Sequence, residues 1–323
     1  MSQSKSVLLE INDLKTHFYL SEGVVHAVNG ASFKLYEGEI LGVVGESGCG
    51  KSVMARSVMR IVPSPGRIVG GEIIYNRPRG NVREPVDLVH LGARGDTMRA
   101  IRGREISMMF QEPISSLSPV HSIGEQIIEA IRTHQACSEE AARQQAIDML
   151  SNVGMPEPSR TIDRYPNELS GGMCQRAMIA MALSSLPCLL IADEPTTALD
   201  VTTEAQILQL LRNLQHKFGM AVMFITHNLG VIAQMAERVI VMYLGRVVED
   251  AGVDDIFYHP LHPLYPGLAA LRPAPGTAAR AQTIGVNPGH SARCLWHPEG
   301  LPVSPPLFRD AARRVRLPGA VLG

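Results

Sequence analysis

Cysteine is scarce and scattered in this sequence. The cysteines number five, and no two of them have CxxC spacing: Cys49, Cys137, Cys174, Cys188 and Cys294. An odd, dispersed set of this kind favours neither a disulfide framework nor a metal knuckle. We therefore expect reduced thiols.

An excess of charge of either sign is also missing. The formal net charge is −1 at pH 7, and no run of Lys and Arg forms a basic stripe. A protein that binds the phosphate backbone of nucleic acid needs such a stripe to displace counterions. Nucleic acid is therefore not expected as a partner.

Long hydrophobic runs are absent as well. The uncharged stretch at residues 177–192 is interrupted by Ser184, Ser185 and Pro187, and it is shorter than the roughly 20 residues that cross a bilayer. Only three consecutive apolar residues precede Glu10, which is too few for the core of a signal peptide. We expect a cytoplasmic protein whose link to any membrane goes through a partner.

What is present indicates an α/β fold. Residues 7–44 alternate apolar runs with turn signals, as antiparallel strands do, and residues 40–44 form an apolar strand followed by a glycine-rich turn and a helical pattern. Residues 112–172 read as an inserted helical subdomain, with Ser138 as a helix N-cap. Strand-length apolar runs at 189–192 and 221–225 then resume a mostly parallel sheet with flanking helices.

The end of the chain is rich in proline. Ten of the 22 prolines lie between Pro263 and Pro318, so residues 260–323 are expected to form an irregular tail after a domain at 1–259.

The glycine-rich turn is the most specific pattern in the chain. Residues 45–52 read GESGCGKS and match G-x-x-x-x-G-K-[ST] between a predicted strand and a predicted helix. In that setting backbone N–H groups surround a β-phosphate, Lys51 reaches the β and γ oxygens, and Ser52 offers its hydroxyl to Mg²⁺. A plain glycine turn before a helix is the alternative. The predicted nucleotide-binding residues are Gly45, Glu46, Ser47, Gly48, Cys49, Gly50, Lys51 and Ser52.

Two acids end the apolar strand predicted at residues 189–192. Carboxylates at the carboxyl end of a strand lie beside the phosphate loop of the same sheet. Asp193 is therefore predicted to hold Mg²⁺, and Glu194 to polarise the attacking water. The alternative is that both acids cap a helix that follows Pro195.

A second helix opens with small residues at 169–173, which read LSGGM. Its N-terminus is also suited to bind an anion. Two such termini with a single lysine-bearing loop indicate either two different nucleotides or one nucleotide shared across a dimer.

In their order these motifs resemble those of the ATP-binding-cassette (ABC) ATPases. The set comprises GESGCGKS, Gln111 after a strand, LSGGM, LLIADEP, residues 198–200 and Thr226-His227, and it covers about residues 7 to 250. The resemblance implies a phosphate-loop NTPase core that binds ATP and Mg²⁺ and hydrolyses ATP in a dimer. Each nucleotide would lie between the phosphate loop of one subunit and the LSGGM turn of the other. By this resemblance Ser170, Gly171 and Gly172 would contact the ATP of the partner subunit, and Asp200 would bridge the subunits.

The resemblance also assigns roles that the residues alone leave open. His227 would hold the γ-phosphate and Glu194, whereas on its own it could simply cap the next helix. Gln111 would touch Mg²⁺ and the attacking water and couple to the membrane subunits, whereas on its own it would be a polar surface residue. Phe18, with Tyr19 as the alternative, would stack on adenine, although an aromatic residue in a strand more often belongs to the core.

Longer stretches resemble the subgroup that imports dipeptides, oligopeptides and related solutes such as glutathione. They include FQEPISSLSPV, YPNELSGGMCQRAMIAMAL and YHPLHPLYPGLAAL. This implies a peripheral protein on the cytoplasmic face of the inner membrane. Its partners would be a second ABC ATPase subunit, identical or not, two permease subunits and an extracytoplasmic solute-binding protein. The alternatives are a soluble ABC ATPase without a transport role and a regulatory half that only binds ATP.

The chain departs from the subgroup at two places. Cys174 stands where Arg is usual, and from the sequence it reads as a small buried hydrophobic residue. The tail has only Cys294, and because an iron–sulfur cluster needs four ligands, none is expected.

Overall fold

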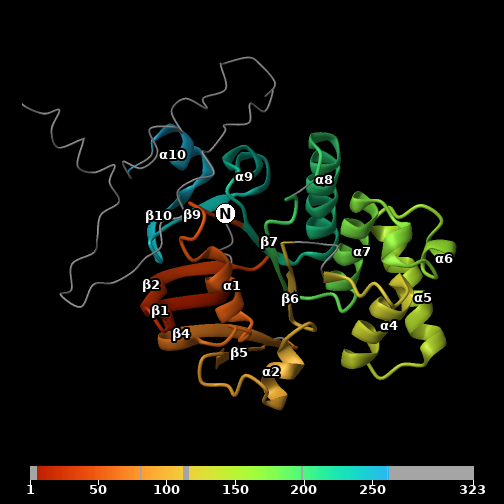
Figure 1. Cartoon of the computed structure of the whole chain (residues 1–323), viewed down its shortest axis with the longest axis horizontal. Helices are drawn as coiled ribbons and strands as arrows, with labels where there is room; N and C mark the ends of the chain where they lie inside the picture. The colour runs from red at the N-terminus through yellow and green to blue at the C-terminus, as the bar shows by residue number, and fades with distance from the viewer. Residues whose placement is uncertain (1–5, 81, 112–115, 198, 260, 262–323) are drawn as a thin grey trace, which may run out of the picture.

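The computed structural model describes residues 6–80, 82–111, 116–197, 199–259 and 261. The described residues form two sheets with helices around them (Figure 1). The first sheet has four strands in the order β2-β1-β4-β5, all antiparallel. Its strands are β1 (Val7–Leu20), β2 (Gly23–Tyr36), β4 (Gly66–Arg79) and β5 (Val82–Asp87). The antiparallel β subdomain predicted from residues 7–44 is therefore confirmed, and β4 and β5 extend it beyond the predicted strands.

The second sheet has six strands in the order β10-β9-β3-β8-β7-β6, and it is parallel except for β10. Its strands are β3 (Ile40–Gly45), β6 (Ile106–Met109), β7 (Leu189–Asp193), β8 (Ala221–Ile225), β9 (Arg238–Tyr243) and β10 (Arg246–Gly252). Every residue of β3, β7 and β8 is buried. Parallel strands covered on both faces need such continuous apolar runs, and for this reason the strands predicted at 189–192 and 221–225 are found.

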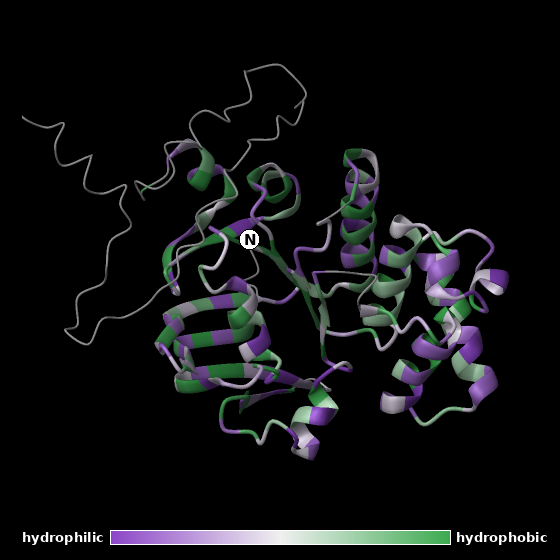
Figure 2. Ribbon diagram, viewed as in Figure 1, coloured by the Kyte–Doolittle hydropathy of each residue, from purple (hydrophilic) through white to green (hydrophobic). Residues whose placement is uncertain are grey.

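The parallel sheet separates two hydrophobic cores. Ile40 and Val44 of β3 belong to the core shared with the helices between residues 123 and 258. Leu41 and Val43, on the opposite face of the same strand, belong to the core shared with α1 and the antiparallel sheet. The green strands at the centre of Figure 2 follow this buried layer.

The helices lie in three places. α1 follows β3 after a short turn, α4 to α7 gather beyond the β6 edge of the parallel sheet, and α8 to α10 follow the later strands (Figure 1). Ser122 caps α4 with a capping box, and Ser138 caps α5 as predicted, accepting a hydrogen bond from the Ala141 N–H at 3.2 Å. No helix in the described ranges combines the length and apolarity that a membrane span requires. The helices are α1 (Lys51–Val58), α2 (Asp96–Ile101), α4 (Ile123–His134), α5 (Glu139–Asn152), α6 (Pro158–Thr161), η1 (Pro166–Glu168), α7 (Gly171–Leu183), α8 (Val201–Phe218), α9 (Leu229–Met235) and α10 (Val253–Tyr258).

The expectations for residues 260–323, including Cys294, concern a segment that, apart from residue 261, lies outside the described residues. The division of the chain at 259 and the bounds of 112–172 for a helical subdomain stay predictions.

An ion pair between β4 and the residue before β6 yields a prediction about stability. Arg77 of β4 donates from Nε to both carboxylate oxygens of Glu105, at 2.8 and 2.9 Å, and the two side chains are 11% and 14% exposed. Arg77→Met should lower the free energy of unfolding by about 3 kcal/mol, because it leaves a largely buried carboxylate without its counter-charge. The control is Arg79→Met, whose partner Glu84 is exposed and whose loss should cost less than about 1 kcal/mol. Chemical denaturation measures both, and equal losses would contradict a special role for the Arg77 pair.

Candidate active site

The phosphate loop, residues 45–52, connects β3 to α1 and is packed tightly between other backbone segments. A Cβ on Gly45, whose φ is +155°, would lie 2.3 Å from the carbonyl oxygen of Met242 in β9. A Cβ on Gly50, whose φ is +104°, would lie 2.1 Å from the carbonyl oxygen of Ala27 in β2. Only glycine fits at these two places, so β2 and β9 hold the loop in its curled form.

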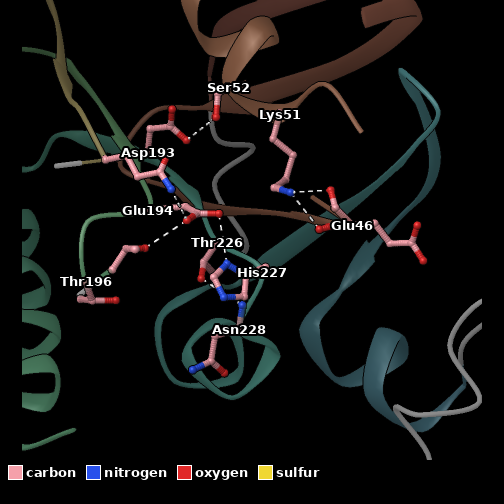
Figure 3. Close-up of polar contacts among 12 residues, drawn as sticks. Glu46, Lys51, Ser52, Asp193, Glu194, Thr196, Thr226, His227 and Asn228 are labelled. Carbon is pink, nitrogen blue, oxygen red and sulfur yellow. Dashed lines mark hydrogen bonds and ion pairs between the residues drawn. The ribbon is translucent and has the colours of Figure 1, made fainter. Parts of the chain in front are cut away.

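Lys51 begins α1 and turns its ammonium group back into the loop. Its Nζ donates to the carbonyl oxygens of Gly45 at 2.8 Å and Glu46 at 2.9 Å (Figure 3), and the residue is buried. The Lys51 ammonium is therefore held at the loop, and its acceptors there are neutral. An anionic phosphate oxygen would be a stronger acceptor for the same donor.

Ser52 and Asp193 join the phosphate loop to the end of β7. The Ser52 hydroxyl donates to Oδ1 of Asp193 at 2.9 Å. Burial raises the pKa of the Asp193 carboxyl, while the hydrogen bond from Ser52 acts in the opposite direction. A cation beside this carboxylate would offset the cost of burying its charge, so this pair of oxygen ligands suits Mg²⁺.

Glu194 is held by three side chains, one of them three residues away and two from distant parts of the sequence. Its Oε1 lies 3.1 Å from Nδ1 of His227, and its Oε2 accepts from Nε2 of Gln111 and from the hydroxyl of Thr197, each at 3.0 Å. Figure 3 shows the carboxylate between Asp193 and the His227 ring. The backbone of Glu194 has φ +48°, a conformation that a non-glycine residue adopts at a cost and that clusters at functional sites.

The helix-capping alternatives for these acids and for His227 are wrong. α8 is capped by Asp200, which accepts from the Thr203 N–H at 2.9 Å, and α9 is capped by Asn228, which accepts from the Gly230 N–H at 3.0 Å. Glu194 and His227 are thus left to face each other across the ends of β7 and β8.

The LSGGM turn, residues 169–173, lies away from the phosphate loop of its own chain. Ser170 caps α7 by accepting from the Met173 N–H at 3.4 Å, and both Ser170 and Gly171 are exposed. In Figure 1, strands β6 and β7 lie between α7 and α1. Gly172 is half-buried and Asp200 is exposed. One chain therefore does not bring the two predicted anion-binding termini together.

Cys174 is buried, as the sequence predicts for a small hydrophobic residue. Its thiol donates to the carbonyl oxygen of Pro166 at 3.4 Å, and burial raises its pKa.

Phe18 and Tyr19 lie near the end of β1. Phe18 is half-buried, and its ring faces Gly66 of β4, where a Cβ would approach within 2.7 Å of it. Tyr19 is 48% exposed. These contacts leave the adenine-stacking role of either residue a prediction.

Sequence reasoning missed some residues around the site. Thr197 bonds to Glu194, and a small hollow beside the phosphate loop is lined in part by Tyr243 and Leu244. The Gly245 N–H then donates to the Cys49 carbonyl at 3.0 Å. Thr197 follows Glu194 by three residues, but nothing in the sequence marks its contact. Tyr243, Leu244 and Gly245 are brought to the loop by the tertiary fold alone. Ala198, part of the quoted motif set, lies outside the described residues.

A phosphate loop after the central parallel strand β3, with an aspartate at the end of β7, two strands along the same sheet, defines a nucleoside triphosphatase of the phosphate-loop class. Comparison with family models gives a match over residues 28–197 to the family described as ABC transporter. The chain belongs to this family, as the sequence motifs indicated, and it is an ABC ATPase.

Individual relatives and solved structures agree. The chain is 52% identical to the "Probable peptide ABC transporter ATP-binding protein y4tR" of Sinorhizobium fredii (strain NBRC 101917 / NGR234), over 80% of this chain and 74% of that protein. It is 48% identical to the "Oligopeptide transport ATP-binding protein OppD" of Bacillus subtilis (strain 168), over 82% and 72%. Its fold resembles the dimeric post-hydrolysis structure of the ATP-binding cassette MJ0796 bound to ADP and Pi, with a TM-score of 0.65, 27% identity, and coverage of 76% and 99%. The predicted fold class is confirmed.

Proposed function

We propose that this chain is the ATP-hydrolysing subunit of an ABC importer for peptides or related small solutes. The observation that carries the catalytic part is the Glu194 carboxylate, which His227 and Gln111 contact at 3.1 and 3.0 Å beside the phosphate loop. The transport part is supported by relatives named for peptide and oligopeptide transport. It is also supported by the "Glutathione import ATP-binding protein GsiA" of Pectobacterium atrosepticum, which is 50% identical over 84% of this chain and 43% of that protein.

The residues of the site then divide the chemistry. The phosphate loop and Lys51 bind the triphosphate, and Glu194 accepts a proton from, or polarises, the water that attacks the γ-phosphorus. His227 fixes the orientation of the Glu194 carboxylate and contacts the γ-phosphate. Mg²⁺, held by Ser52, Asp193 and Gln111, would neutralise charge on the phosphate oxygens when it is bound.

The second half of each site would come from another ABC ATPase subunit. Ser170 and Gly171 are exposed at the N-terminus of a 13-residue helix, where backbone N–H groups and the helix dipole favour an anion. With Gly172, they would close on the nucleotide bound by the partner's phosphate loop, and the exposed Asp200 would bridge the subunits. The dimeric state of the MJ0796 structures supports this arrangement.

We further propose that the dimer is peripheral, on the cytoplasmic face of the inner membrane. It would act there on two permease subunits, to which an extracytoplasmic solute-binding protein would deliver the solute. Residues 1–259 would form the nucleotide-binding domain, with its helical subdomain at about 112–172, and residues 260–323 its tail. Adenine would stack on Phe18 or, as the alternative, Tyr19.

ATP turnover in the assembled transporter tests the function. The chain should be reconstituted in lipid vesicles with its membrane partners, and phosphate release measured with and without the binding protein and a peptide mixture. We expect peptide-loaded binding protein to raise turnover several-fold over the empty protein, because transport and hydrolysis are coupled. A turnover indifferent to peptide, binding protein and permeases would instead favour an ATPase without a transport role.

A further inference from the structure

Gln175 is a fully buried polar residue on the helix that the LSGGM turn opens. Its side chain has no exposed surface. Its Nε2 donates a hydrogen bond to the carbonyl oxygen of Pro195. α7 and the end of β7 are therefore joined by a side chain as well as by apolar packing.

The accepting carbonyl belongs to the residue directly after Glu194. Glu194 itself has φ +48°, and its backbone N–H donates to the Ile225 carbonyl at 2.9 Å, while the Thr197 N–H donates to its carbonyl at 3.2 Å. The bond from Gln175 fixes the next peptide along. The backbone around Glu194 is thus held at two places. Ile225 of β8 binds the Glu194 N–H, and Gln175 of α7 binds the carbonyl of the next residue, Pro195.

A second contact joins α7 to the segment that follows Glu194. A Cβ on Gly172 would lie 2.9 Å from the methyl carbon of Thr203 in α8. The N–H and hydroxyl of Thr203 donate to the Asp200 carboxylate at 2.9 and 2.7 Å. The start of α7 therefore touches the first turn of α8, while Gln175, about one turn further on, reaches Pro195.

Packing alone does not account for Gln175. Its Oε1 is buried without a hydrogen-bond partner among the described residues, and an unpaired buried acceptor costs about 1–3 kcal/mol. An apolar residue of the same size would avoid that cost but would lose the bond to Pro195. What the amide of Gln175 adds over an apolar residue of the same size is therefore the hydrogen-bond donor to Pro195.

We propose that Gln175 is a positioning residue for the hydrolytic step, tying the helix that carries the LSGGM turn to the peptide that places Glu194. The proposal rests on the proposed function, in which Glu194 acts on the attacking water and Ser170 contacts the partner's nucleotide. Because one rigid helix carries both Ser170 and Gln175, a shift of α7 on closing over the partner's ATP is passed to the backbone beside Glu194.

The test compares Gln175→Met with Gln215→Met. Methionine keeps the length of the side chain and removes the donor. Gln215 is the matched control, because it is also buried, donates from Nε2 to the carbonyls of Gly38 at 2.8 Å and Met220 at 3.2 Å, and has the same unpartnered Oε1. It lies near the C-terminal end of α8, in contact with neither Glu194 nor α7 through these bonds. ATP turnover and the affinity for a fluorescent ATP analogue are measured on the assembled protein at matched folded fraction.

Gln175→Met should lower kcat at least about tenfold and change ATP affinity less than about twofold, because a displaced catalytic group impairs the chemical step and leaves binding intact. Gln215→Met should keep kcat within about twofold of the parent. Equal kcat in the two variants, or a loss of ATP affinity that matches the loss of kcat, would overturn the proposal. If Gln175→Met does not fold, Gln175→Asn, one methylene shorter and still polar, takes its place with the same expectations. Parental turnover by Glu194→Gln would refute the catalytic role that the proposed function gives to Glu194, which separates the two failures.

Discussion

Glu194→Gln should stop ATP hydrolysis and leave ATP binding intact. Glutamine keeps the shape of the side chain and can still contact Gln111, Thr197 and His227, but it cannot take a proton from water. Losing a group that activates the attacking water should lower kcat at least about 10²-fold, or roughly 3 kcal/mol of barrier. Phosphate release measures the loss, and equilibrium binding of ATP measures what is retained.

The retained ATP should also change the assembly. With hydrolysis stalled, the nucleotide stays between the phosphate loop of one subunit and the LSGGM turn of the other, so the dimer should accumulate with ATP in size-exclusion chromatography. Glu129→Gln, on an exposed position of α4, is the control and should keep the parental rate. A parental rate in Glu194→Gln would show that another group activates the water.

The parallel sheet and the phosphate loop could be predicted because their signals are local. β3, β7 and β8 are buried over their whole length, so each appears in the sequence as an uninterrupted apolar run. The phosphate loop lies within eight consecutive residues, and its glycines are required by close approaches of Met242 and Ala27. Sequence spacing alone is enough to find such features.

β4 and β5 could not be predicted, because their local signals point elsewhere. Residues 65–100 are rich in Gly, Pro and Arg, and β4 contains Gly70, Gly71 and Pro78. A Cβ on Gly71, at φ +85°, would lie 2.4 Å from the Asp13 carbonyl in β1, so this glycine is required by the neighbouring strand. Tertiary pairing with β1 overrides the weak strand propensity of the segment.

The contacts of the site divide in the same way. Asp193 and Glu194 could be proposed from their place at the end of an apolar strand. The partners of Glu194 could not be found from the residues alone, since Gln111 lies 83 residues away in the sequence and His227 lies 33. The pairing of His227 with Glu194 is expected only from the resemblance to the ABC ATPases. The bond from Gln175 to Pro195 spans 20 residues and has no motif of its own. Which side chains meet at a strand end depends on strand order, and here the order β8-β7-β6 places Thr226-His227, Asp193-Glu194 and Gln111 side by side.

Lys51→Ala should abolish tight ATP binding. The Lys51 ammonium is buried at the loop and bonded to the Gly45 and Glu46 carbonyls, so it is already placed where the β and γ oxygens of a triphosphate would lie. Removing a charge-assisted donor of this kind should weaken ATP affinity at least about 10²-fold, or roughly 2.7 kcal/mol. Equilibrium binding of ATP to the purified chain measures the change.

The control must separate the loss of this donor from the loss of one positive charge. Lys217→Ala removes a lysine near the C-terminal end of α8, where its ammonium bonds to the side chain of Asn152 at 2.7 Å, and it should leave ATP affinity within about twofold, because salt screens distant exposed charges. The two substitutions also differ in the size of their effect on folding. Without nucleotide, Lys51→Ala leaves the Gly45 and Glu46 carbonyls without this donor, whereas the exposed Lys217 bond contributes little.

ATP should raise the melting temperature of the parent and of Lys217→Ala, because it binds to the folded state. It should fail to raise the melting temperature of Lys51→Ala. Equal thermal stabilisation of all three by ATP would show that the nucleotide does not depend on the loop lysine.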